Sequence, residues 1–384
     1  MTIRVPLVAT RDASYDILIG PGLVQQLETI VREYCPAAAY AVISDSHVGK
    51  LYGESIAKRV SGVGCRVELF TFPAGEWNKT RDTWASLSDR MLAAHFSRDC
   101  AVIALGGGVV NDVAGFVAAT YLRGVSLVQV PTTLLAMIDS SIGGKTGVDV
   151  PAGKNLLGAF HQPRVVIADP AVLGSLSSTQ LAAGLAEAVK HGVIADADYF
   201  AFLEGERAAI FAKHAPALER VVRRSIEIKA AVVAQDERET GKRAILNFGH
   251  TVGHAIEATS KYDVLHGEAV AMGMVYEARL AETLGIAAAG TAQRITSALE
   301  RLNLPVERPA GSHVDDLVEA MRVDKKVRAG EIRLALPRTI GCAHGDEATG
   351  WTVPVPEATI RQVLVNMSPT SLSTSPHGRN HPSD

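Results

Sequence analysis

Short apolar runs punctuate the first 175 residues of the chain. They cover residues 39–43, 101–105, 127–130 and 165–168, and each is followed by serine, glycine, proline or aspartate. Runs of this kind are typical of strands that are buried on both faces of a parallel sheet. The pattern predicts an α/β domain, which we place at residues 1–177.

From about residue 178 the spacing of apolar positions becomes helical. Residues that favour helix dominate 180–191, 217–236, 251–259 and 266–284, and Pro216 stands where a helix can begin. We therefore predict a mostly α-helical domain over 178–367, with one isolated strand at 331–337. The Ser-, Pro- and His-rich residues 368–384 are expected to form a disordered tail.

Composition narrows the range of partners. The 384 residues carry 38 basic and 41 acidic side chains, a net charge of -3, with no dense basic stripe, so nucleic acid is an unsuitable partner. No run reaches the ~18 apolar residues of a membrane span, and the N-terminus lacks a signal-peptide core. The four cysteines are widely spaced, which argues against a disulfide framework or a thiolate zinc site. We expect a cytoplasmic protein that binds a small molecule.

A glycine-rich turn follows the predicted strand at 101–105. Backbone N–H groups at such a turn, where a helix begins, can bind a phosphate closely. A tight turn without a ligand would look the same, and the pattern is not the GxGxxG fingerprint of ordinary Rossmann dehydrogenases. The turn comprises Gly106, Gly107, Gly108, Val109, Val110, Asn111 and Asp112. Asp45 and the pair Thr132-Thr133 follow other predicted strands, where open α/β sheets bind ligands, and the stretch with Gly75, Glu76 and Lys79 adds a carboxylate and a cation. Ordinary turn chemistry or surface charge is the alternative for each of them.

The polar stretch from 138 to 155 is richer in charge and glycine than a connection needs. Gly144-Lys145-Thr146 resembles the end of a P-loop, but Asp139 stands where the first glycine of that motif is required, so we exclude a nucleoside triphosphatase. Lys145 and Lys154 beside glycine turns suit a phosphate or carboxylate ligand. A solvated loop is the alternative.

A metal site is indicated in the helical half. His250 and His254 are four residues apart on one helical face, His266 follows, and Glu187 shares a face with Lys190 upstream. One carboxylate and two imidazoles form the ligand set of a catalytic Zn²⁺ site, which other divalent ions can also occupy. The residues alone leave open which two histidines bind the ion. The third would be suited to proton transfer.

Together these segments resemble the 3-dehydroquinate synthase family over about residues 24–363. The matching motifs are Gly106-Gly107-Gly108-Val109-Val110-x-Asp112, Val130-Pro131-Thr132-Thr133, Asp139-Ser140-Ser141-x-Gly143-Gly144-Lys145, Gly153-Lys154-Asn155, Gly184-Leu185-Ala186-Glu187-x-x-Lys190, Asn247-Phe248-Gly249-His250 and Leu265-His266-Gly267-Glu268.

The resemblance implies a Rossmann-like NAD-binding α/β domain followed by an α-helical metal-binding domain, usually as a homodimer with the active site between domains. It implies the conversion of 3-deoxy-D-arabino-heptulosonate 7-phosphate to 3-dehydroquinate and phosphate, a step of the shikimate pathway. In that reaction NAD⁺ oxidises a hydroxyl and phosphate leaves by β-elimination. NADH then returns the hydride, and the enol closes by an intramolecular aldol addition. Zn²⁺ or Co²⁺ is the implied ion.

The resemblance also assigns roles by position. The implied metal ligands are Glu187, His250 and His266, with His254 for proton transfer. The implied substrate and catalytic groups are Asp139, Lys145, Lys190, Lys229, Arg243, Asn247, Arg123 and the pair Lys325-Lys326. The implied NAD contacts are Asp45, Gly75, Glu76, Lys79, Gly107, Gly108, Val109, Val110, Asn111, Asp112, Thr132, Thr133, Lys145, Lys154, Asn155, Val172, Leu173, Gly174 and Ser175.

The chain departs from the family pattern at a few positions near the implied NAD site. Asn111 replaces a usual glycine, and asparagine tolerates positive φ if the turn needs it. Ala74, Asp149 and the pair Trp77-Asn78 also differ. Two alternatives stay open: a related cyclase that makes a valiolone or an inosose, and an NAD- and metal-dependent polyol dehydrogenase.

Overall fold

The computed structural model describes residues 12–62, 64–260, 263–323 and 331–367. The chain divides into two compact units. The first comprises Met1–Thr132 and Ser140–Ala171, and the second comprises Thr133–Asp139 and Val172–Asp384. The predicted tail at 368–384 lies outside the described residues.

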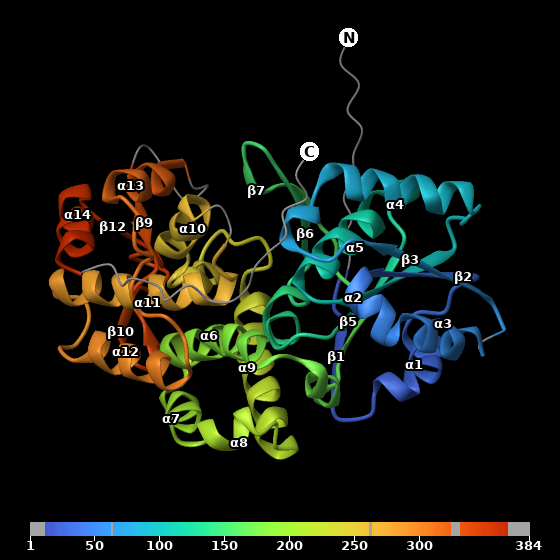
Figure 1. Cartoon of the computed structure of the whole chain (residues 1–384), viewed down its shortest axis with the longest axis horizontal. Coiled ribbons are helices and arrows are strands. Elements are labelled where there is room, and N and C mark those ends of the chain that lie inside the picture. The colour runs from blue at the N-terminus through green and yellow to red at the C-terminus, as the bar shows by residue number, and fades with distance from the viewer. Residues whose placement is uncertain (1–11, 63, 261–262, 324–330, 368–384) are drawn as a thin grey trace, which may run out of the picture. The chain divides into compact units, whose positions relative to one another are not determined.

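The first unit is built on a six-stranded, wholly parallel sheet (Figure 1). Its strands, in spatial order, are β1 (Asp16–Ile19), β8 (Val165–Ala168), β5 (Ser126–Pro131), β4 (Cys100–Gly106), β2 (Ala39–Asp45) and β3 (Arg66–Phe72). The four predicted strands are confirmed as β2, β4, β5 and β8. The strands β1 and β3 were not predicted. They are the edge strands: β1 has only four residues, and polar residues interrupt the apolar pattern of β3.

Helices cover both faces of this sheet. They are α1 (Leu27–Tyr34), α3 (Glu54–Ser61), α4 (Arg81–Ala93) and α5 (Gly108–Thr120), with the single turn α2 (Ser46–Val48). Helices α4 and α5 pack on one face, where Leu87 and Val113 join a core with Ile43 and Val102 of the strands. Figure 1 shows α1 and α3 on the opposite face. Alternate side chains of β2 and β4 are therefore buried on both sides, which is why these strands read as continuous apolar runs.

An antiparallel hairpin occupies the polar stretch that we expected to bind a ligand. Its strands are β6 (Lys145–Val150) and β7 (Gly153–Phe160). Thr146 packs on α5, where Gly115 leaves room for its side chain. The hairpin places Lys145 at its start, and Lys154 and Asn155 just after its turn.

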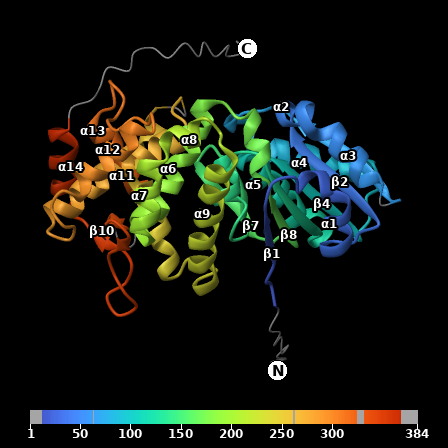
Figure 2. The same ribbon diagram turned by 90° about the horizontal axis from the view of Figure 1, so that it is seen from below.

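The second unit is mostly helical, as predicted, and its long helices lie side by side (Figure 2). The helices are α6 (Ser178–Ala195), α7 (Ala197–Gly205), α8 (Arg207–Phe211), α9 (Ala215–Gln235), α10 (His250–Thr259), α11 (His266–Thr283), α12 (Thr291–Arg301), α13 (Val314–Val323) and α14 (Glu357–Asn366). The four predicted helices correspond to α6, α9, α10 and α11. Pro216 lies in the first turn of α9.

Helices α10 and α11 approach each other at their backbones. A Cβ atom on Gly273 would collide with the carbonyl oxygen of Gly249, and one on Gly253 would lie 3.0 Å from the carbonyl oxygen of Ala269. Gly249 itself has φ +81°, which suits glycine at the start of α10. Three glycines thus fix the distance between the two helices that carry the predicted ligand histidines.

The prediction of one strand at 331–337 was wrong. Arg333–Leu334 forms β9 and pairs with β12 (Val353–Pro354), whereas Pro337–Thr339 forms β10 and pairs with β11 (Cys342–Ala343). The apolar side chains of 332, 334, 335 and 336 are buried. The apolar run therefore marks a buried segment of chain, and not a single strand with continuous hydrogen bonding to a neighbour.

Candidate active site

The glycine-rich turn joins β4 to α5 as predicted. Gly107 is the N-cap of α5 and Gly108 its first residue. A Cβ on Gly106 would lie 2.6 Å from Cβ of Val110, so the turn needs glycine at that position. Asn111 and Asp112 belong to α5, and Asn111 is buried. Its φ is not positive, so this position does not need the conformational freedom of the usual glycine.

Several residues of the implied NAD site form one ionic network in the first unit. The ammonium of Lys79, 4% exposed, donates to Asp112 Oδ2 at 2.5 Å and to Asn155 Oδ1 at 2.6 Å. Burial alone would lower the pKa of Lys79, but Asp112 and other carboxylates raise it. Asp149, a departure from the family pattern, accepts from the backbone N–H of Asn155 at 2.8 Å. This bond supports the positive φ of Asn155.

The remaining implied NAD contacts lie near the ends of strands and in the connections that follow them. Lys154 pairs with Glu76 at 3.1 Å. Asp45 Oδ1 accepts from the N–H groups of His47 and Val48 at 2.8 Å and caps α2. Thr133 Oγ1 accepts from the N–H of Ala136 at 3.1 Å. The turn from 172 to 175 is part of a 3-10 helix, and Gly75, with φ +119°, lies against the Trp77 ring.

In the second unit, three helices bring the implied metal ligands together. Glu187 lies on α6, His250 opens α10 and His266 opens α11. Glu187 Oε1 lies 3.5 Å from His250 Nε2 and 3.7 Å from His266 Nε2. This oxygen is buried and has no hydrogen-bond partner among the residues that the structure describes. One carboxylate oxygen facing two imidazole nitrogens is an arrangement that fits a divalent ion.

The two histidines experience different electrostatic surroundings. Burial and the nearby Lys190 ammonium lower the pKa of His250 well below its usual range. Burial would also lower the pKa of His266, but Glu257 and Glu187 outweigh it and raise that pKa to about 10.

A row of alternating charges lies beside this cluster. Lys190 contacts Glu187 Oε2 and lies 3.8 Å from Asp139 Oδ1, and Lys229 donates to the same Asp139 oxygen at 2.7 Å. Burial alone would raise the pKa of Asp139, but Lys229 and Lys190 hold it well below the usual range. Burial lowers the pKa of Lys229 to about 8 despite Asp139. Three of the predicted substrate-binding side chains are therefore neighbours.

Arg243 and Asn247 lie in a 3-10 helix at Lys242–Asn247 rather than an α-helix. Residues four apart do not share a face there, so their spacing does not align them. Arg243 is 2% exposed. Burial is the main cause of the lowered pKa of Lys229, and the Arg243 guanidinium adds a smaller lowering. Asn247 donates to Glu239 Oε1 at 2.5 Å.

Of the other predicted side chains, His254 lies beside the histidine cluster, and its ring centroid is 6.0 Å from that of His266. His254 is one turn beyond His250, with ring centroids 5.3 Å apart. Arg123 is exposed, with φ +69°, at the end of a 3-10 helix after α5. The pair at 325–326 lies outside the described residues.

Sequence reasoning missed two buried carboxylates and one histidine in this unit. Glu257 faces His266, and Glu277 accepts from the N–H groups of Gly249 at 2.6 Å and Val252 at 3.1 Å. His191 is fully buried, and neither of its ring nitrogens has a partner in the described part of the chain. The spacing of 250, 254 and 257 on one helical face was a signal for Glu257.

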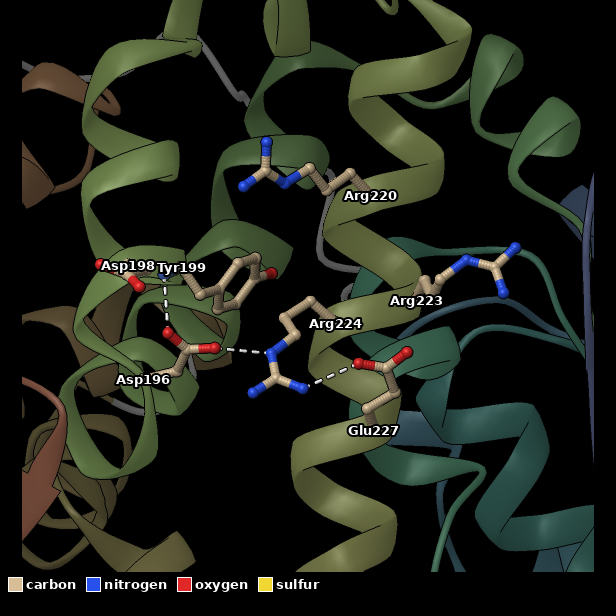
Figure 3. Close-up of a pocket in the computed structure, with 7 residues that line it drawn as sticks. All are labelled: Asp196, Asp198, Tyr199, Arg220, Arg223, Arg224 and Glu227. Carbon is tan, nitrogen blue, oxygen red and sulfur yellow. Dashed lines mark hydrogen bonds and ion pairs between the residues drawn. The ribbon is translucent and has the colours of Figure 1, made fainter.

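A pocket elsewhere in this unit does not suit an anionic ligand (Figure 3). Its lining residues are Asp196, Asp198, Tyr199, Arg220, Arg223, Arg224 and Glu227. Arg224 pairs with Asp196 at 2.6 Å and with Glu227 at 2.8 Å, and Arg223 pairs with Glu219 at 2.7 Å. Two of the three arginines are therefore already paired with carboxylates, and the third, Arg220, lies 4.0 Å from the centroid of the Phe202 ring.

The α/β unit and the helical unit together resemble the solved structures of sugar-phosphate cyclases. Residues 69–183 match the family model for the 3-dehydroquinate synthase N-terminal region, and residues 184–327 match the model for its C-terminal region. The chain belongs to the 3-dehydroquinate synthase family.

Relatives and solved structures agree with this family. A 3-dehydroquinate synthase of Symbiobacterium thermophilum is 51% identical over 325 residues, which cover 84% of this chain and 91% of the relative. The fold resembles 2-epi-5-epi-valiolone synthase from Streptomyces hygroscopicus with NAD⁺ and Zn²⁺ bound, at TM-score 0.84 and 30% identity, over 94% of this chain and 99% of that one. It also resembles 2-deoxy-scyllo-inosose synthase complexed with carbaglucose-6-phosphate, NAD⁺ and Co²⁺, at TM-score 0.83 and 29% identity, over 92% and 96%.

Within the described residues, no helix is both long enough and apolar enough to cross a membrane.

Proposed function

We propose that the chain converts 3-deoxy-D-arabino-heptulosonate 7-phosphate to 3-dehydroquinate and phosphate, with NAD and a divalent ion. The observation that carries this proposal is the Glu187–His250–His266 cluster beside the row formed by Lys190, Asp139 and Lys229. A cluster of metal ligands next to buried cations suits a substrate that presents hydroxyls together with anionic groups.

The proposed roles follow from these positions. A divalent ion, Zn²⁺ or Co²⁺, held by Glu187, His250 and His266 would lower the pKa of the hydroxyls that it binds. Lys190 and Lys229 are buried ammonium groups that can donate to the substrate's oxygens while Asp139 keeps them oriented. His254 stands one helical turn from His250, where an imidazole can move a proton.

The remaining assignments rest on the family resemblance. Arg123 and Lys326 would hold the phosphate or carboxylate, with Lys145, Arg243 and Asn247 completing the substrate site. NAD, which takes up and returns a hydride when bound, would lie against the α/β unit. Its proposed contacts are the glycine-rich turn from Gly107 to Asp112, the polar residues Asp45, Gly75, Glu76, Lys79, Thr132, Thr133, Lys145, Lys154 and Asn155, and the turn from 172 to 175. We also infer a cytoplasmic homodimer.

Phosphate release from 3-deoxy-D-arabino-heptulosonate 7-phosphate, with catalytic NAD and Zn²⁺ or Co²⁺, tests the reaction. We expect stoichiometric phosphate and 3-dehydroquinate, no net change in nicotinamide absorbance, and loss of activity and bound metal in His250→Ala. Net NADH formation would indicate a dehydrogenase instead. No release from this substrate, but release from sedoheptulose 7-phosphate or glucose 6-phosphate, would indicate a related cyclase.

A further inference from the structure

His266 lies between two carboxylates that face opposite sides of its ring. Its Nδ1 lies 3.3 Å from Glu257 Oε2, and its Nε2 lies 3.7 Å from Glu187 Oε1. Glu257 is on α10, whereas His266 opens α11. The contact therefore joins the two helices that carry the proposed ligand histidines.

The contact with Glu257 determines which ring nitrogen of His266 carries the proton. A neutral imidazole has one N–H and one lone pair, and the hydrogen bond at one nitrogen decides which atom can bind a metal. Donation from Nδ1 of His266 to Glu257 leaves the lone pair of Nε2 directed toward Glu187. His250 achieves the same orientation with a peptide group, because its Nδ1 donates to the carbonyl oxygen of Phe248 at 3.2 Å.

Glu257 can hold this position because it is fixed and shielded. It is 2% exposed on α10, the helix whose backbone packs against α11 at Gly253 and Gly273. A carboxylate is also a stronger acceptor than the peptide carbonyl that serves His250. The two histidines therefore differ in the residue that sets their orientation.

We propose that Glu257 is a positioning residue that fixes the tautomer and ring orientation of His266 and thereby strengthens metal binding. This inference rests on the proposed ligand set. Glu257 would not itself bind the ion. The alternative is that Glu257 is itself a ligand, together with His254 and His266. Single ligand atoms of these three residues also lie within 4.8 Å of one another.

The test measures Zn²⁺ affinity of the full-length protein by competition with a chromogenic chelator, together with the visible spectrum of the Co²⁺ form. We expect Glu257→Ala to weaken Zn²⁺ binding about 10- to 100-fold. Glu257→Gln keeps an acceptor for Nδ1, so we expect a smaller loss and an unchanged Co²⁺ spectrum. Glu268→Gln removes an equal charge from the first turn of α11, where Glu268 accepts from the N–H of Leu265, and should leave affinity unchanged.

Each other outcome overturns the inference. Unchanged affinity in both Glu257 variants would leave Glu257 with no role at the ion. Equal losses of Zn²⁺ affinity in Glu257→Ala and Glu257→Gln, together with an altered Co²⁺ spectrum, would indicate that Glu257 is itself a ligand. If the unmodified protein bound no Zn²⁺, the proposed ligand set itself would fail. Far-UV circular dichroism of each variant separates loss of metal from loss of fold.

Discussion

Lys229 is the buried cation whose charge is most sensitive to pH near neutrality. Burial lowers its pKa to about 8, with partial compensation from Asp139, whereas Lys190, paired with Glu187 and Asp139, has a raised pKa. Two lysines on the same aspartate therefore respond differently to alkali. Below about pH 8 both are ammonium groups, and above it Lys229 becomes a neutral amine that can no longer attract an anion.

We expect kcat/KM to fall as pH rises through about 8, because Lys229 loses the charge that binds the substrate. Lys229→Arg keeps its charge, so it should remove this alkaline decline while lowering kcat/KM at pH 7 about 10- to 100-fold through altered geometry. Steady-state pH profiles of the two proteins provide the measurement. An identical decline in Lys229→Arg would exclude Lys229 as its source, and the exposed Lys58→Arg is the matched control.

His254 should affect the rate without holding the ion. We expect His254→Ala to lower kcat about 10²- to 10⁴-fold, the usual contribution of a general acid or base. Metal content per chain, measured by mass spectrometry, should stay unchanged in this variant but fall in His250→Ala. Loss of metal from His254→Ala would instead favour the His254–Glu257–His266 grouping.

At the scale of elements, the helices and strands that could be predicted are those whose apolar residues form a regular or an unbroken pattern. The fully buried β2 and β4 appear in the sequence as continuous apolar runs, and α6 and α9 appear as stretches of residues that favour helix. Polar residues break the apolar pattern of the edge strand β3, and the hairpin of β6 and β7 is stabilised by packing on α5, which the sequence does not show. Glu187, His250 and His266 could be proposed from sequence motifs. The hydrogen bonds of Glu257 and Glu277 could not, because they depend on how α10 packs against α11.

Glu277 should determine where α10 begins. Its buried carboxylate accepts two N–H groups at the start of that helix, which also benefits from negative charge there. We expect Glu277→Ala to lower the free energy of unfolding by about 2 to 4 kcal/mol, because it leaves buried donors unpaired. Glu277→Gln retains an acceptor and should cost less. Denaturant unfolding measures both, and equal stability of Glu277→Ala and the parent would contradict this capping role.

At the scale of the whole molecule, four cations of the proposed NAD and substrate sites are buried, whereas Arg123 and Lys145 are exposed. Lys79, Lys190, Lys229 and Arg243 are each at most 5% exposed, although the chain as a whole carries a net charge of -3. Anions would therefore be attracted by local groups rather than by the overall field of the protein. Paired carboxylates offset part of the cost of burying Lys79, Lys190 and Lys229.

Metal and NAD should stabilise the protein separately. A ligand that binds only the folded state adds about 2.7 kcal/mol at 100 times its dissociation constant, so Zn²⁺ and NAD should each raise the melting temperature. In Glu187→Ala we expect the Zn²⁺ shift to disappear and the NAD shift to remain. Differential scanning calorimetry with each ligand measures this, and loss of both shifts would mean that the substitution disturbs more than the metal site.

The glycines between α10 and α11 give the proposed metal site an unusual dependence on the main chain. Because Gly249, Gly253 and Gly273 bring the two helices into backbone contact, the separation of His250 from His266 is governed by peptide groups instead of side-chain rotamers. An added methyl group at Gly273 could not be absorbed by a neighbouring side chain changing its rotamer. The site should therefore be intolerant of a side chain at any of these three positions, because each would push α10 away from α11.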